Sequence, residues 1–363
     1  MLAYDKLADL AKAPYRRTDD RRLVAVFPMW FPYEILLAGG LRASEWWGFP
    51  IDTTLADAHF PPYVCTLVKA NFEIMLGDGH RPDGMVFPSS TCDTIQNSAG
   101  LFRRLFPQAF SAYFRMSQNP DSQAAPEFLA GEIERLIGEV SRFAGRPIVA
   151  DDLRAAIVTV NRFRRAARQL LAKMAAGKIS VPAAKVYTAI KGALADISDE
   201  STRLLEEFAA TISVGESAGP KLMLVGMLAD PLEALTVMEN AGARIAGDDL
   251  GLGWRTLSTD AAETGDPVAA LVQRLLNAPP CSSLHFATKR RADAVVARAR
   301  ELKADAVVFT RVKFCDPEAF DYPNLKKALD DAGLPSLLVE RELTAGAEGA
   351  IATRVEAFIE QIA

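Results

Sequence analysis

The stretch DAVVFTRVKFCDPE, residues Asp305 to Glu318, places a cysteine between a run of apolar residues and the start of a helix. The stretch GMVFPSSTCDT, residues Gly84 to Thr94, repeats this order. A short, continuous apolar run is typical of a strand covered on both faces, as in a parallel sheet. In open parallel sheets, ligands bind at the carboxyl ends of the strands. The two stretches therefore predict two parallel sheets, each with a cysteine where such a sheet keeps its site.

Strand and helix patterns alternate on both sides of these stretches, which is typical of βαβ units. The strand patterns lie at 23–27, 84–87, 109–114, 221–228, 243–246, 305–309 and 336–340. Residues 126–211 carry helical periodicity instead. We therefore expect an α/β fold with two doubly wound parallel-sheet domains of the Rossmann or flavodoxin type, residues 1–125 and 216–363. A helical insert, residues 126–215, separates them, and a ligand site is expected in the cleft between the domains.

The composition is that of a globular protein and argues against two classes of function. The 363 residues are 50% hydrophobic and 24% charged, with a formal net charge of -5. A nucleic-acid-binding domain is normally basic, and no apolar stretch reaches the roughly 18 residues of a membrane span. The first residues, MLAYDKLADLAKAPYRR, lack the apolar core of a signal peptide. We expect no nucleic-acid partner, no membrane association and a cytoplasmic location.

Four cysteines are the main candidates for chemistry: Cys65, Cys92, Cys281 and Cys315. A disulfide framework is not expected in a cytosolic chain of this length. Cys92 and Cys315 each stand before the start of a helix, whose electropositive end would lower the thiol pKa. That environment favours metal ligation or nucleophilic chemistry, although a cysteine can also simply fill a short loop as a small apolar residue.

Whether the cysteines are metal ligands, nucleophiles or inert residues depends on which other groups could lie near them. A Cys–His mechanism needs a base, and none of the three histidines, His59, His80 and His285, belongs to a cysteine-containing catalytic motif. The Cys-x-x-Cys pairs of zinc sites are absent from the sequence. Cysteines far apart in sequence can still hold an iron–sulfur cluster, because the thiolates need only meet in space. Spacing alone leaves inert thiols, a nucleophile and a cluster open.

Aromatic, acidic and glycine residues supply further candidates. The segment FPMWFPYE follows the first strand pattern and carries Trp30 and Phe31, which are either core residues or an aromatic wall for an apolar ligand. Glu34 begins a helix and is either a structural cap residue or a general acid or base. Gly39 and Gly40 end that helix. Trp30, Phe31, Gly39 and Gly40 are our candidates for substrate binding, and Glu34 is our candidate for catalysis.

The segment GDDLGLGWR, residues 247–255, is expected to form a loop after the strand at 243–246. Its neighbouring acids, Asp248 and Asp249, could bind a divalent cation, but paired acids in a loop are more often solvated. Neither G-x-G-x-x-G nor GxxxxGK[ST] occurs in the sequence. The sequence therefore predicts neither a dinucleotide fingerprint nor a P-loop.

Taken together, the ordered motifs resemble the 2-hydroxyacyl-CoA dehydratase and benzoyl-CoA reductase family of iron–sulfur subunits. The likeness covers nearly the whole chain and is carried by PYEILLAGGL, YVCTLVKANFE, FPSSTCDTIQN, VNRFRRAARQL, AGARIAGDDLGLGWR, KADAVVFTRVKFCDPE and LPSLLVERELTAGAEGAIATRVEAFIEQI. Within the family, the chain is most similar to the shorter subunits of the benzoyl-CoA reductase type. It departs from many relatives at VGMLADPLE, where they have a cysteine-and-acid motif and this chain has Leu228, Ala229 and Asp230.

The resemblance implies a [4Fe-4S] cluster held by Cys65, Cys92 and Cys315, whereas Cys281 lies outside the motifs and is interpreted as a bystander. It implies two partners: a related cluster-bearing subunit, and a separate ATP-dependent activator that supplies low-potential electrons. The use of ATP on another chain would explain the missing P-loop. The implied substrate is an acyl-CoA thioester. Three ligands leave one iron without a cysteine, as a catalytic metal would need.

Three functions follow, in order of preference. The first is a cluster-bearing subunit of a benzoyl-CoA reductase type of enzyme, which adds electrons and protons to the ring of an aryl-CoA thioester. The second is a subunit of a 2-hydroxyacyl-CoA dehydratase, in which one electron on the thioester carbonyl makes a ketyl radical that loses water. The third is a two-lobed small-molecule binding protein with inert cysteines and no cluster.

Overall fold

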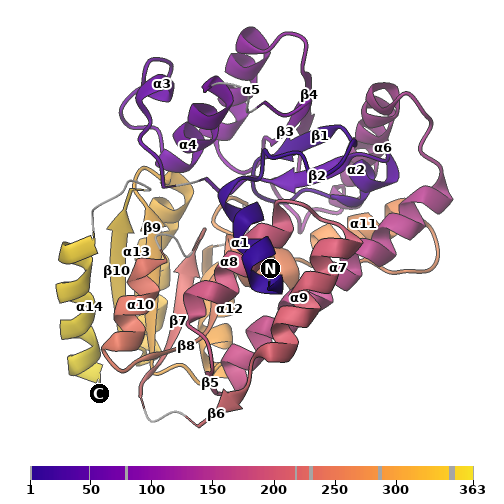
Figure 1. The fold of residues 1–363 in the computed structure, drawn as a ribbon. Coiled ribbons are helices and arrows are strands. Elements are labelled where there is room, and N and C mark those ends of the chain that lie inside the picture. Colours follow the sequence, from indigo (N-terminus) through magenta and orange to yellow (C-terminus); the bar gives the residue numbers. More distant parts are fainter. Residues whose placement is uncertain are drawn as a thin grey trace.

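The computed structural model describes residues 2–48, 50–77, 81–216, 219–228, 232–284, 288–342 and 348–362. Within these ranges, two four-stranded sheets form the centres of two α/β halves, one above the other in Figure 1. The N-terminal half, drawn in indigo to purple, lies above the C-terminal half, drawn in orange to yellow. In the described part of the chain, none of the helices combines the length and the apolar character needed to cross a membrane.

The two sheets have the same topology. Neighbouring strands are β2, β1, β3 and β4 in the N-terminal sheet, and β8, β7, β9 and β10 in the C-terminal sheet. All strand pairs in both sheets are parallel. Counted from the first strand of each sheet, both orders read 2-1-3-4, as in doubly wound folds of the flavodoxin type. The predicted fold class is confirmed. The bounds are β1 Leu23–Val26, β2 Arg42–Glu45, β3 Gly84–Pro88, β4 Phe110–Phe114, β7 Lys221–Gly226, β8 Arg244–Leu250, β9 Ala306–Val312 and β10 Ser336–Arg341.

Helices connect the strands and form most of the middle of the described chain. Those of the N-terminal part are α1 Ala3–Lys12, α2 Glu34–Ala38, α3 Thr54–Asp57, α4 Thr66–Leu76 and α5 Asp93–Leu105. The expected insert contains α6 Ala125–Ala144, α7 Ala150–Ala176, α8 Ala183–Leu194 and α9 Asp199–Thr211, together with a short antiparallel pair, β5 Lys178–Ile179 and β6 Val214–Gly215. The C-terminal part contains α10 Glu233–Asn240, the π-helical turn η1 Gly251–Arg255, α11 Pro267–Leu276, α12 Thr288–Glu301, α13 Asp316–Asp331 and α14 Glu348–Ile362.

Strand β2 was not predicted, because its sequence RASE has charged residues at both ends and no apolar run. All four of its residues are nevertheless buried. Arg42 lies 3.3 Å from Asp196, a carboxylate that follows α8. Glu45 accepts a hydrogen bond of 2.6 Å from the hydroxyl of Tyr33. The strand is stable because distant side chains satisfy its charges, which no local pattern reveals.

The prediction that GDDLGLGWR forms a loop with solvated acids was wrong. Strand β8 continues through Asp248 and Asp249, and both are buried. Asp248 accepts hydrogen bonds from the Tyr187 hydroxyl at 2.9 Å and from the backbone N–H groups of Leu250 and Trp254. Asp249 pairs with Arg291 of α12. These donors of the protein take the place of water as hydrogen-bond partners of the two carboxylates, so both acids can be buried in the strand.

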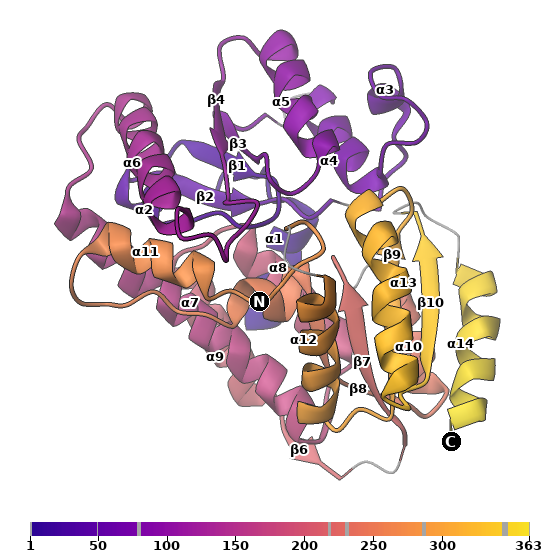
Figure 2. The ribbon, with the colours of Figure 1, turned by 180° about the vertical axis from the view of Figure 1, so that it is seen from behind.

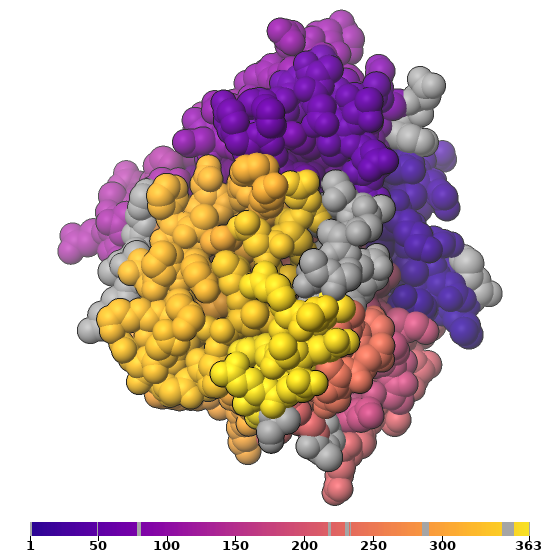
Figure 3. Space-filling model, turned by 90° about the vertical axis from the view of Figure 1, so that its left-hand side faces the viewer, coloured from indigo at the N-terminus to yellow at the C-terminus, as the bar shows by residue number. Residues whose placement is uncertain are grey.

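Helices distant in sequence connect the halves. Helix α1 packs against α8 and α9 of the insert, and α11 packs against α6 and α7. Figure 2, seen from behind, shows α11 beside α6 and along α7, on the side of the N-terminal sheet. The face shown in Figure 3 likewise has the N-terminal half resting directly on the C-terminal half.

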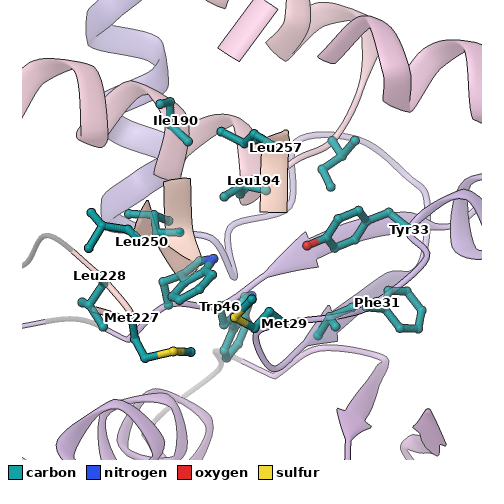
Figure 4. Close-up of a cluster of buried hydrophobic side chains, with 14 of the residues drawn as sticks. Met29, Phe31, Tyr33, Trp46, Ile190, Leu194, Met227, Leu228, Leu250 and Leu257 are labelled. Atoms are coloured by element: carbon teal, nitrogen blue, oxygen red, sulfur yellow. The ribbon is translucent and has the colours of Figure 1, made fainter. Parts of the chain in front are cut away.

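One hydrophobic core runs through all three parts of the chain. Figure 4 shows a section of it in which side chains meet from three sources. The N-terminal half supplies Met29 and Trp46, the insert supplies Leu194, and the C-terminal half supplies Met227 and Leu250. A second, smaller core lies in the C-terminal half alone. Because the main core is shared, the two sheets are held in a fixed relation to each other.

Candidate functional site

A cavity of about 610 Å³ lies where the carboxyl ends of the two sheets face each other. Its wall includes Pro28 after β1 and residues 89–92 after β3. From the other sheet come Met227 after β7 and Val312, Phe314 and Cys315 at and after the end of β9. In a doubly wound sheet of this order, the ligand site lies beyond the first and third strands, where the strand order reverses. In both sheets this position borders the same cavity, which lies where a ligand site was expected.

Cys65, Cys92 and Cys315 all line this cavity. Each is the N-cap residue of a helix: Cys65 of α4, Cys92 of α5 and Cys315 of α13. The sulfur of Cys92 accepts the N–H of Ile95 at 3.5 Å. Three electropositive helix ends therefore point their cysteines toward the same space, and such ends favour an anionic guest.

Burial dominates the acidity of these thiols. It raises the pKa of Cys92 to about 12 and also raises the pKa values of Cys65 and Cys315. The N–H groups of the helix starts lower each pKa, but by less than burial raises it. The predicted lowering of the thiol pKa was wrong, because the sulfurs lie deeper than the sequence indicates. The charge of Cys65 contributes to the raised pKa of Cys92, and the charges of both to that of Cys315, since the three lie near one another.

This donor set fits a multi-iron cluster better than a single ion. A zinc ion needs its ligands to converge on one point, and among the described residues no three His, Cys, Asp or Glu side chains do so. The cysteines of a four-iron cluster bind different iron atoms, so their sulfurs surround a space. Three cysteines that line one cavity meet that requirement. Cluster binding would release the three thiol protons, since the ligands are thiolates.

Buried charges lie in and behind the wall of the cavity on the side of the C-terminal sheet, where Arg291 and Asp321 line the cavity and Arg255 and Glu318 lie behind them. Arg255 of η1 lies 3.3 Å from Glu318 in the first turn of α13. Arg291 of α12 pairs with Asp249 and lies 3.5 Å from Asp321. Sequence reasoning missed this network because its members come from four elements. The one available signal was that Arg255 and Glu318 stand inside two of the motifs, GDDLGLGWR and KFCDPE.

Cys281 also lines the cavity, although the sequence marked it as a bystander. The residue is only 1% exposed. Its sulfur accepts hydrogen bonds from Nη1 of Arg255 at 2.7 Å and from Oγ of Ser283 at 3.3 Å. The cavity therefore has four cysteines in its wall.

The aromatic candidates lie beside the cavity and do not form its wall. Trp30 is buried, and its Nε1 donates a hydrogen bond of 3.1 Å to Oγ of Ser283, which does line the cavity. Phe31 is buried in the core, with edge contacts to the rings of Tyr33 and Phe114. Trp30 is thus linked to the cavity through one side chain, and Phe31 packs as a core residue.

The other predicted residues lie away from the cavity. Glu34 is fully buried and forms an ion pair of 2.7 Å with Arg164 of α7. Gly39 packs closely against Val140 of α6, and Gly40 has a φ of +70°, which favours glycine. The structure therefore does not bring Glu34, Gly39 or Gly40 together with the cysteines.

The histidines add no base to the cavity in the described structure. His59 is exposed, between α3 and α4, and is not part of the cavity wall. His80 and His285 lie outside the described residues, as do Ala229 and Asp230 of the departing motif. Leu228 is buried in the core.

A comparison with models of protein families shows which family the chain belongs to. The model of the family described as 2-hydroxyglutaryl-CoA dehydratase, D-component, matches residues 28–362. The chain belongs to this family. The 2-hydroxyglutaryl-CoA dehydratase D-component match covers every strand of the two sheets except β1, the helices between the sheets and all four cysteines. The predicted family is thereby confirmed.

Relatives of known name are similar over almost their full length. The (R)-phenyllactyl-CoA dehydratase beta subunit of Clostridium sporogenes is 26% identical over 94% of this chain and 92% of its own. A benzoyl-CoA reductase subunit of Thauera aromatica is 24% identical over 92% of this chain and 89% of its own. The (R)-2-hydroxyglutaryl-CoA dehydratase subunit beta of Acidaminococcus fermentans is 25% identical over 95% of this chain and 94% of its own. These nearly equal identities do not separate the dehydratase and reductase branches of the dehydratase D-component family.

Proposed function

We propose that the chain is the [4Fe-4S] subunit of a heteromeric acyl-CoA enzyme driven by low-potential electrons. One observation carries the proposal: Cys65, Cys92 and Cys315, each at the start of a different helix, line a single cavity between the two sheets. Cysteines that are scattered in sequence and line one cavity are the pattern of a cluster site. The family membership supports the same assignment.

The residues of this chain would hold the cluster and set its surroundings. Cys65, Cys92 and Cys315 supply thiolate ligands, and the helix N-termini behind them offset the negative charge of the ligated sulfurs. A bound [4Fe-4S] cluster supplies one-electron transfer at low potential.

The names of the relatives support the proposed partners. All three are named as subunits, two of them as beta subunits, so each belongs to an assembly of more than one kind of chain. We expect this chain to pair with a related cluster-bearing subunit in the same way. The absence of a P-loop from the sequence fits a separate ATP-dependent activator as electron donor. The proposed substrate is an acyl-CoA thioester.

Each branch of the family has support. The description of the family and two of the relatives above favour a 2-hydroxyacyl-CoA dehydratase. The motif likeness and the Thauera relative favour the benzoyl-CoA reductase type. Turnover of benzoyl-CoA against a 2-hydroxyacyl-CoA, measured with the partner subunit and the activator, separates the two branches.

The cluster itself is tested on this chain alone. The protein is reconstituted anaerobically with iron and sulfide, and we expect a brown protein with about four irons per chain. The variants C65S, C92S and C315S should each lose most of the bound iron, whereas Q96A, which alters the cavity wall without removing a sulfur, should keep it. A folded wild-type protein that takes up no iron would refute the proposal. It would favour the two-lobed binding protein, whose ligand affinity the cysteine variants should leave unchanged.

A further inference from the structure

Strand β4 forms an outer edge of the N-terminal sheet, and among the described residues it has a neighbouring strand only on its β3 side. Figure 2 shows it between α5 and α6. The N–H of Phe110 donates to the C=O of Asp83, the residue that precedes β3. In a parallel pair, alternate residues of a strand direct their N–H and C=O groups to opposite sides, so those of Ser111 and Tyr113 face away from β3. The strand therefore ends the sheet with backbone groups that no other described strand pairs.

A groove of about 700 Å³ runs along this edge. Five consecutive residues, 109–113, line it. Side chains of a strand alternate between the two faces of a sheet, so a space that touches consecutive residues lies along the edge itself. The sides of the groove come from the last turns of two helices, with Arg103 from α5 and Arg142 and Phe143 from α6. The groove therefore suits an extended segment, since five residues of strand span roughly 17 Å.

The groove is basic, although the chain as a whole has a formal net charge of -5. Its charged lining residues are Arg103, Arg115, Arg135, Arg142 and Glu139. Arg115 reaches Glu132 only at 3.5 Å, and Arg135 pairs with Glu132 and Glu139. The ion pairs of the described residues leave Arg103 and Arg142 without a carboxylate. Arginines whose charge the protein itself does not match attract the carboxylates of another molecule.

The two sides of the groove differ in character. On the α5 side, the guanidinium of Arg103 lies 4.6 Å from the centre of the Tyr113 ring, and that of Arg115 lies 5.5 Å from it. Phe110, on the opposite face of the strand, stacks on Phe143 of α6 with ring centroids 4.6 Å apart. An extended segment along β4 would therefore meet arginines on one face and aromatic rings on the other. Because side chains alternate along a strand, the segment that fits has acids at every second position and apolar residues between them.

We propose that β4 accepts an acidic, extended segment of a partner protein as an added strand. The backbone of the segment pairs with the N–H and C=O of Ser111 and with the N–H of Tyr113, as in strand addition to other open sheet edges. The C=O of Tyr113 already accepts Nη2 of Arg135 at 2.7 Å, so the added ladder ends there. The carboxylates of the segment face the arginines on the α5 side, and its apolar side chains contact the stacked phenylalanines. No residue of this groove lines the cavity between the two sheets, so the two sites are tested independently.

The first test measures the binding of a defined peptide to the full-length chain by fluorescence anisotropy. The probe is a fluorescein-labelled peptide of eight residues in which glutamate and valine alternate, and a peptide with lysine in place of glutamate is its charge control. R103E/R115E should weaken binding of the acidic peptide at least about tenfold, because attraction becomes repulsion. The matched control R104E/R300E makes the same change of charge at two exposed arginines outside the groove and should leave the affinity within about twofold.

A second peptide separates an added strand from the pairing of charges alone. Methylation of alternate backbone nitrogens removes the N–H groups that face β4 and keeps every carboxylate of the peptide. We expect the methylated peptide to bind at least about tenfold more weakly, because two backbone hydrogen bonds at about 1 kcal/mol each are lost.

Several results would refute the added strand. Equal affinity of the acidic peptide for wild type and R103E/R115E is one, and equal affinity of the methylated and unmethylated peptides is another. Binding of inorganic pyrophosphate without binding of the peptide would make the groove a site for small anions. Aggregation of R103E/R115E, together with no binding of the peptide by wild type, would show that the arginines only guard the open edge. If R103E/R115E does not fold, R103Q/R115Q replaces it, and binding at least about threefold weaker than wild type is then the expected result.

Discussion

The ion pair between Glu34 and Arg164 decides between two roles for Glu34. The pair joins α2 to α7 across 130 positions of sequence, with an N–O distance of 2.7 Å, and both side chains are at most 1% exposed. We consider E34Q, which keeps the shape of the side chain and removes its charge. If Glu34 is a structural residue, this change leaves the Arg164 guanidinium buried without its counter-charge, and Asn161 remains its hydrogen-bond partner at 3.0 Å.

The magnitude follows from the distance and the burial. At 2.7 Å and an effective dielectric constant of about 20, the attraction is about 6 kcal/mol before the cost of desolvation. Removing one partner of a buried pair typically costs about 3–5 kcal/mol. Arg274 adds to this cost: burial and the charge of Arg164 already lower its pKa to about 10, while Glu34 opposes that lowering. We therefore expect E34Q to lower the free energy of unfolding by about 3–5 kcal/mol.

Urea unfolding of the cluster-free protein measures this loss, followed by circular dichroism and by tryptophan fluorescence. The matched control is E206Q, because Glu206 pairs with Arg162 at the same 2.7 Å on the surface, where such a pair contributes about 1 kcal/mol or less. The double variant E34Q/R164M should be more stable than E34Q alone, since it removes the unpaired charge. A loss below about 1 kcal/mol for E34Q, with loss of turnover in the assembled enzyme, would contradict the structural role and favour the catalytic one.

Three further predictions rest on buried groups. Burial raises the pKa of Glu45 from 4.5 to about 7, so between these pH values the folded chain holds a proton that the unfolded chain has lost. The free energy of unfolding should therefore fall by roughly 3 kcal/mol as the pH rises through this range. In E45Q, urea unfolding measured from pH 4.5 to 8 should lack this fall. G192A should lower the free energy of unfolding by about 1–3 kcal/mol, because the added Cβ would overlap the backbone of α1. G131A, whose added Cβ would lie in open space in α6, should instead raise the free energy of unfolding by up to about 1 kcal/mol. Equal effects of the two variants would refute the packing argument. Y187F removes the hydroxyl bond of 2.9 Å to the buried carboxylate of Asp248 and should cost about 1–3 kcal/mol in thermal or urea unfolding, while no loss would show that water replaces it.

Local patterns predicted most of the architecture. The apolar runs at 84–87 and 305–309 became β3 and β9, and the cysteines after them became helix N-caps. These features depend on hydrophobic periodicity and on which residues begin a helix, and both act over a few neighbouring positions. The same signals failed for β2 and for the second half of β8, whose charged residues are read as exposed until their partners are known.

The sequence by itself determined the doubly wound class, the strand ends that carry Cys92 and Cys315, and the family. Tertiary structure alone decided which charges are paired, how acidic the thiols are, and that Cys281 shares their cavity. The contacts responsible join residues far apart, such as Trp30 and Ser283, 253 positions from each other. Burial and electrostatic pairing are properties of the folded arrangement in space, so residues without a local pattern acquire their chemistry only when the two sheets are brought together.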